Sequence, residues 1–107
     1  FESVLTGTYK TEPVNDTDLS VYTVVFTQES AGDSVSGSVT ITRTPTAGSG
    51  SAQTETLNFT VDFDNIRVKL THVSGTAIGA DLVFSDDGEL MLEDRYGKAY
   101  TLNVFNN

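Results

Sequence analysis

The stretch from Glu55 to Leu70, which reads ETLNFTVDFDNIRVKL, decides the fold class of this chain. Every second residue in it is apolar, first over Leu57, Phe59, Val61 and Phe63, and then, beyond Asp64-Asn65, over Ile66, Val68 and Leu70. A period of two is typical of a half-buried strand, and Asp and Asn are residues that tight turns favour. The stretch therefore predicts two antiparallel strands joined by a short hairpin turn.

The same alternation recurs along the whole chain, and turn residues separate its segments. We expect eight strands, over residues 6–11, 19–28, 35–44, 55–63, 66–73, 76–84, 89–93 and 98–105. Asp87-Gly88 supplies the clearest hairpin signal, and Gly37, which interrupts an apolar row, predicts a bulge, a bend or a close approach of two backbones. Consecutive hairpins favour an all-β fold, an antiparallel eight-stranded up-and-down barrel, with a two-sheet β-sandwich as the alternative.

Length and composition are consistent with a single domain over residues 1–107. The chain has no cysteine, which excludes disulfides, thiolate metal sites and a cysteine nucleophile. His72 is the one histidine, so a zinc site built from several histidines is excluded as well. We predict neither a metal nor a cofactor, and packing must stabilise the fold.

The net charge of −9 argues against a nucleic acid or an anionic membrane as partner, because the few basic residues are scattered singly. No apolar run is long enough to form a transmembrane segment. Serine and threonine are abundant and lysine is scarce, from which we predict a secreted or periplasmic protein. The sequence begins at Phe1 rather than at methionine, so we expect a leading segment upstream, through which the protein could be lipid-anchored.

Three groups of residues could carry chemistry. The Asp-rich turns around Asp16, Asp62 and Asp86 offer oxygen ligands for a hard cation, but Asp, Asn and Gly are also what turns are made of. His72 with a carboxylate such as Asp81 could perform acid–base catalysis, but no nucleophile stands out beside them. A glycosidase needs two carboxylates at a defined separation, and the sequence gives no means of choosing two among its fifteen acidic residues. We therefore predict no catalytic residues and a protein that is not an enzyme.

Inward-facing aromatic rings are the best candidates for a binding site. In a barrel they could line a cavity for one small apolar or amphipathic ligand, or they could simply fill the core. The predicted ligand-binding residues are Tyr22, Phe26, Phe59, Phe63, Phe84 and Tyr100. The segment 45–54, reading PTAGSGSAQT, is small and uncharged, and we expect a flexible loop that could act as a lid.

Two short motifs resemble those of small bacterial lipocalin-like (calycin-type) barrels. The first is Leu5-Thr6-Gly7-Thr8-Tyr9, in which Tyr9 stands where the family has a tryptophan after Gly-x. The second is Gly97-Lys98-Ala99-Tyr100-Thr101-Leu102 near the end of the chain. The resemblance implies a β-barrel, export from the cytoplasm and, in many members, a lipid anchor.

The sequence thus leads to two hypotheses about function. The first is a non-enzymatic, exported lipocalin-like domain that binds a small apolar or amphipathic ligand in the barrel. The alternative is a structural, interaction or carbohydrate-binding accessory module of a larger secreted protein, with a filled core and with the hydroxyl-rich strand face of residues 36–42 presented to a partner.

Overall fold

The computed structural model describes residues 7–14, 18–30, 34–48, 50–62 and 64–105. Nine strands run through these ranges: β1 (Gly7–Lys10), β2 (Val21–Ser30), β3 (Ser34–Thr44), β4 (Gln53–Asp62), β5 (Arg67–Gly75), β6 (Asp81–Phe84), β7 (Leu90–Glu93), β8 (Ala99–Thr101) and β9 (Asn103–Phe105). No helix in the described ranges has the length and apolar character that crossing a membrane requires. The all-β prediction is confirmed.

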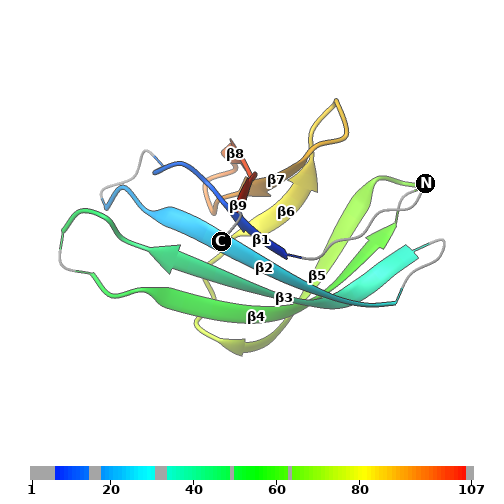
Figure 1. Cartoon of the computed structure of the whole chain (residues 1–107), viewed down its shortest axis with the longest axis horizontal. Helices are drawn as coiled ribbons and strands as arrows, with labels where there is room; N and C mark the ends of the chain where they lie inside the picture. Colours follow the sequence, from blue (N-terminus) through cyan, green and yellow to red (C-terminus); the bar gives the residue numbers. More distant parts are fainter. Residues whose placement is uncertain (1–6, 15–17, 31–33, 49, 63, 106–107) are drawn as a thin grey trace.

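The strands form two antiparallel sheets. One has the order β5-β4-β3-β2-β1-β9 and the other the order β6-β7-β8. Figure 1 shows that the larger sheet curves, and that β6, β7 and β8 of the smaller sheet face its strands β3 and β4 from the opposite side of the molecule. Leu102 separates β8 from β9, so that one extended segment pairs with β7 at its start and with β1 at its end.

The hydrogen bonds of the described residues form two separate sheets and not the predicted closed barrel. The strands do follow one another in meander order, but among the described residues β5 and β6 form no ladder, although they are neighbours in space. We call this unpaired boundary between β5 and β6 the seam. The chain crosses it over residues 76–80, where the backbone N–H of Thr76 bonds the carbonyl of Thr54 at 2.9 Å, so this part of the expected sixth strand is not a strand.

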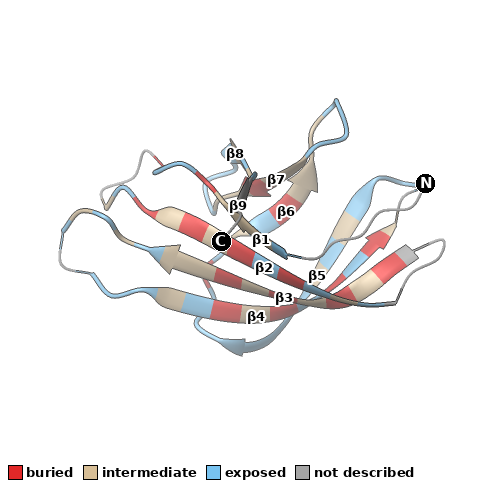
Figure 2. Ribbon diagram, in the orientation of Figure 1, coloured by how far each residue is buried: buried red, intermediate tan, exposed pale blue. Residues whose placement is uncertain are grey.

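The core lies between the two sheets. Val24, Ile41 and Val61 of the larger sheet and Leu82 and Leu92 of the smaller one are at most 1% exposed. Figure 2 shows buried residues alternating with more exposed ones along β2, β3 and β4, as the period of two predicts. At about 25 cal/mol per Å² of buried apolar area, this face supplies the main stabilisation of a chain that has no cysteine to form a disulfide.

Two register shifts interrupt the ladders of the larger sheet, and a glycine lies at or near each of them. The pairing of β2 with β3 shifts between Gln28 and Ser30, opposite Gly37. A Cβ atom added at Gly37 would come within 2.0 Å of the carbonyl oxygen of Thr27, so only glycine fits this close approach of two backbones. A second shift lies between Thr56 and Leu57, and Gly75, which pairs with Glu55 beyond it, has no room for a Cβ atom because the carbonyl oxygen of Thr54 is too close. The bulge predicted at Gly37 is confirmed.

The position predicted for Ile66 is wrong. Ile66 belongs to the turn between β4 and β5, not to the inward row of β5, and it is 57% exposed. Its φ of 52° is in the left-handed region, which β-branched residues rarely adopt. The four-residue connection takes its geometry from the carboxylate of Asp62, which accepts hydrogen bonds from the backbone N–H of Asp64 and Asn65. The apolar row of β5 therefore begins at Val68.

Candidate functional site

The predicted aromatic residues do not form one exposed pocket wall. Phe26 and Phe59 are 3% and 1% exposed, and their rings meet edge to face with centroids 5.5 Å apart. Tyr9 packs on the other side of Phe26 with centroids 5.6 Å apart. Edge-to-face rings at this spacing are an attractive arrangement that fills volume efficiently. The middle of the core is therefore occupied by these side chains.

The remaining predicted ligand-binding residues are more dispersed. Tyr22 is buried, on β2, whereas Phe84 and Tyr100 are half-buried and pack against the core from the smaller sheet. The hydroxyl of Tyr100 bonds the carboxylate of Asp94 at 3.2 Å. Phe63 lies outside the described residues. The structure thus places five of the six rings in or against one core.

Charged side chains continue the inward rows at one end of the larger sheet. Arg43 follows Ile41 in the row of β3, and Glu55 precedes Leu57 in the row of β4. Glu55 pairs with Ile41 and Gly75, and Arg43 pairs with Tyr22 and Gln53, so these residues occupy neighbouring positions of the same face. We call this set, with His72, the polar end of the core.

Glu55 is the most buried charged group of the polar end. Its side chain is 6% exposed, and its Oε2 lies 2.7 Å from Nδ1 of His72. Its Oε1 accepts the backbone N–H of Ile78 at 3.1 Å. A buried carboxylate requires such partners, because an unpaired one would strongly destabilise the fold. Glu55 therefore ties β4 to β5 and to the segment that crosses the seam.

The partner of His72 differs from the one suggested by the sequence. Asp81 is exposed and its carboxylate accepts the backbone N–H of Leu82 at 2.9 Å, whereas His72 pairs with Glu55. The register of the hairpin runs unbroken from Asp62 opposite Arg67 to Leu57 opposite His72, and this places His72 on the inward face. No role for Glu55 was predicted from the sequence. Its position two residues before Leu57, in the alternation that continues over Phe59 and Val61, indicates that its side chain faces the core.

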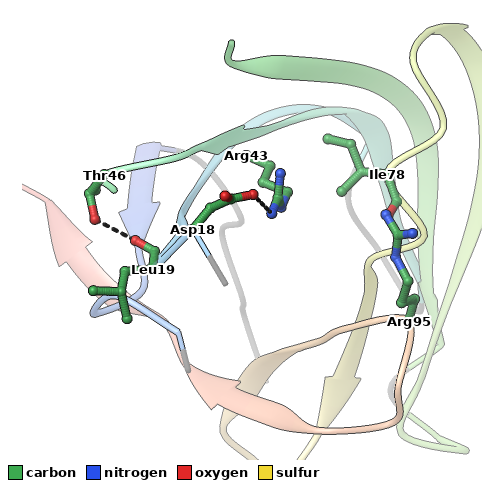
Figure 3. Close-up of polar contacts among 6 residues, drawn as sticks. All are labelled: Asp18, Leu19, Arg43, Thr46, Ile78 and Arg95. Atoms are coloured by element: carbon green, nitrogen blue, oxygen red, sulfur yellow. Dashed lines mark hydrogen bonds and ion pairs between the residues drawn. The ribbon is translucent and has the colours of Figure 1, made fainter. Parts of the chain in front are cut away.

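Arg43 and Arg95 complete the polar end. Nη2 of Arg43 bonds Oδ2 of Asp18 at 3.1 Å, with the two side chains 17% and 37% exposed. Nη2 of Arg95, from the turn after β7, lies 3.4 Å from the carbonyl oxygen of Ile78. Figure 3 shows the two guanidinium groups on different sides of this end of the molecule, Arg43 beside Asp18 and Arg95 beside Ile78.

The loop expected to be flexible is tied down at its start. The backbone N–H groups of Thr46 and Ala47 both bond the carbonyl of Asp18, at 3.0 and 2.9 Å. The hydroxyl of Thr46 donates to the carbonyl of Leu19 at 2.6 Å, as Figure 3 shows. With the Arg43–Asp18 ion pair, these bonds fasten the beginning of the loop to the segment before β2.

The Asp-rich turn at Asp62 is built by hydrogen bonds within the turn. The side-chain amide of Asn65 donates to Oδ2 of Asp62 at 2.7 Å, and together with the backbone N–H groups it lowers the pKa of Asp62 below its ordinary value. In the described ranges, no three histidine, aspartate or glutamate side chains gather so that they could hold a metal ion. Asp16 lies outside the described residues.

Comparison of the chain with protein-family models, with curated proteins and with solved structures finds no match. The geometry of the polar end, with its buried carboxylate, its histidine and its inward arginine, is therefore the basis for an inference about function.

Proposed function

We propose that this protein is a non-enzymatic, exported binding domain whose lipocalin-like meander, opened at the seam, holds a small amphipathic ligand. One observation carries the proposal: Arg43 and Glu55 occupy inward positions at one end of rows whose buried hydrophobic residues form the core. Both charges have partners within the fold, His72 and the N–H of Ile78 for Glu55 and Asp18 for Arg43, and these partners hold them in place beside the apolar rows. A ligand with an apolar body and a polar head would use both parts of this face.

In this proposal the residues have distinct roles. Phe26 and Phe59 form the floor of the site, and Tyr22, which pairs with Arg43 across β2 and β3, forms its wall next to the polar end. Phe63, Phe84 and Tyr100 remain proposed contacts of the apolar body. Burial of that body drives binding, and the polar end orients the head group.

The test combines native mass spectrometry of gently purified protein with titration of an environment-sensitive apolar dye. We expect either a bound mass that is lost on denaturation or saturable dye binding at one site. Arg43→Gln should weaken binding several-fold, whereas Arg67→Gln, on the exposed part of β5, should leave it unchanged. A bare mass together with no saturable binding would rule out the carrier function.

A second candidate function is an interaction module with a filled core. The continuous edge-to-face packing of Tyr9, Phe26 and Phe59 favours it, because these rings fill the centre of the core. The same experiment separates the two candidates, since a filled core takes up no dye and retains no mass.

A further inference from the structure

The strand β5 forms one edge of the larger sheet, and this edge faces the seam. Within the described residues β5 pairs with β4 alone. In an antiparallel ladder every second residue directs its backbone N–H and C=O away from the partner strand, so β5 presents a row of these groups along the seam. Groups with this spacing are complementary to the backbone of another extended peptide.

The inward apolar row of the larger sheet is incompletely covered where it reaches β5. On β4, Phe59 and Val61 are 1% and 0% exposed. The residues opposite them on β5, Leu70 and Val68, are only half-buried, and Figure 2 shows no buried position on β5. A strand added at this edge would cover the row with its own apolar side chains, and this burial would favour its binding.

The outward side of β5 carries positive charge in a strongly acidic chain. Arg67 and Lys69 lie there and are exposed, whereas the net charge of the chain is −9. Asp62 lies opposite Arg67 and offsets part of its charge, but the residue opposite Lys69 is the neutral Thr60. Acidic side chains on the outward face of an added strand would therefore meet complementary charge.

The same features argue against a second copy of this chain as the occupant of the edge. Two copies of β5 would bring Arg67 and Lys69 of both copies to one short boundary, and both chains are strongly acidic elsewhere. The register shift in the β4–β5 ladder leaves Val73 as the extra residue of a bulge, which ends the regular edge. Basic side chains and bulges are features that keep edge strands from pairing with their own copies.

We propose that the edge of β5 over residues 67–72 binds an extended segment of another protein in which apolar and acidic residues alternate. The backbone of this segment pairs with β5, its apolar side chains cover Val68 and Leu70, and its acidic side chains contact Arg67 and Lys69. The site lies at the seam rather than at the polar end, so it does not depend on ligand binding in the core.

Fluorescence anisotropy of a short labelled peptide of alternating valine and glutamate, titrated with the full chain, tests the proposal. We expect saturable binding, and no binding of a peptide with the same side chains and an N-methylated backbone, which has no N–H to donate. Arg67→Gln/Lys69→Gln should weaken binding about tenfold. Lys10→Gln/Lys98→Gln changes the net charge equally, on β1 and before β8, and should bind as the parent does.

Hydrogen exchange locates the bound peptide, because pairing with β5 should slow exchange over residues 67–72 more than in β8. The apolar dye that tests the core site should bind Arg67→Gln/Lys69→Gln as it binds the parent, so the two sites can succeed or fail independently. Circular dichroism of each variant separates lost binding from lost folding.

Several outcomes would overturn the proposal. They are the absence of saturable binding, binding of the N-methylated peptide, and equal affinity of the peptide for the two double variants. A dimer of the free protein with β5 amides already protected would also overturn it, because a second copy would then occupy the edge.

Discussion

At the scale of single residues, the turn between β4 and β5 links protonation to stability. The pKa of Asp62 is below its ordinary value because it accepts hydrogen bonds from the side chain and the backbone of Asn65 and from the backbone of Asp64. A carboxyl whose pKa is lowered on folding stabilises the fold above its unfolded pKa, and this contribution is lost as the pH falls through the lower folded value.

Asn65→Ala is therefore expected to raise the pKa of Asp62, because it removes the largest cause of the shift. It should also lower stability at neutral pH, and the difference from the parent should shrink in acid, where Asp62 is protonated. NMR titration of the Asp62 carboxyl and urea unfolding at several pH values measure both effects. An unchanged titration midpoint in Asn65→Ala would refute this account of the turn.

Ile66 offers a substitution that should stabilise the protein. It has φ 52° and is 57% exposed, so it gains little from burial while it keeps an unfavourable conformation. Asparagine tolerates this region better, and Ile66→Asn should raise the free energy of unfolding by about 1 kcal/mol. Val25→Asn, in regular strand on β2, is the control and should lower it. Loss of stability in Ile66→Asn, measured by urea unfolding, would contradict the prediction.

At the scale of elements, the bulge opposite Gly37 has the strictest steric requirement. Gly37→Ala places a Cβ atom 2.0 Å from the carbonyl oxygen of Thr27, so the backbones of β2 and β3 must separate. We expect a loss of about 3 kcal/mol in unfolding free energy. Gly88→Ala is the comparison: it has φ 81° but nothing within 4 Å, and should lose only about 1 kcal/mol. Equal losses in urea unfolding would mean that backbone conformation, rather than the close approach, decides both.

The strands themselves could be predicted from sequence, and their ends less well. Alternation located β2, β3 and β4 because each buries one face, and the bulge at Gly37 appeared as a gap in an apolar row. The expected strand over 76–84 failed over its first residues, because the N–H groups of Thr76 and Ile78 bond Thr54 and the Glu55 carboxylate instead of a neighbouring strand. These are tertiary bonds that a local period of two does not encode.

The candidate site was predictable only in part for the same reason. His72 and Glu55 are not opposite each other in the ladder, because His72 lies opposite Leu57 and Glu55 lies opposite Gly75, so their contact is a diagonal one between side chains. Asp81 is closer to His72 in sequence, but nothing local shows that it bonds the next residue of its own strand. An inward charge can be recognised in the sequence when a charged residue continues the every-second-residue pattern of an apolar row, as Arg43 does after Ile41.

At the scale of the whole molecule, the seam is where the two sheets should separate first. The strands β2, β3 and β4 are paired on both sides, whereas β5 and β6 each have one strand partner in the described part of the chain. Bonds from the crossing segment to Thr54, Glu55 and Arg95 hold the seam together. Local opening starts where backbone hydrogen bonds are few and exposed.

Hydrogen exchange followed by mass spectrometry should therefore show β5 and β6 exchanging faster than β2, β3 and β4. Glu55→Ala leaves the N–H of Ile78 without its acceptor, and it should speed exchange over residues 67–84 more than over β1 to β3. His72→Ala retains the Ile78 bond and should have the smaller effect. Equal acceleration in all strands of Glu55→Ala would contradict this prediction. It would mean that the two sheets open together and that Glu55 contributes to global stability, because the loss of a hydrogen bond that stabilises only the seam speeds exchange only in the strands next to it.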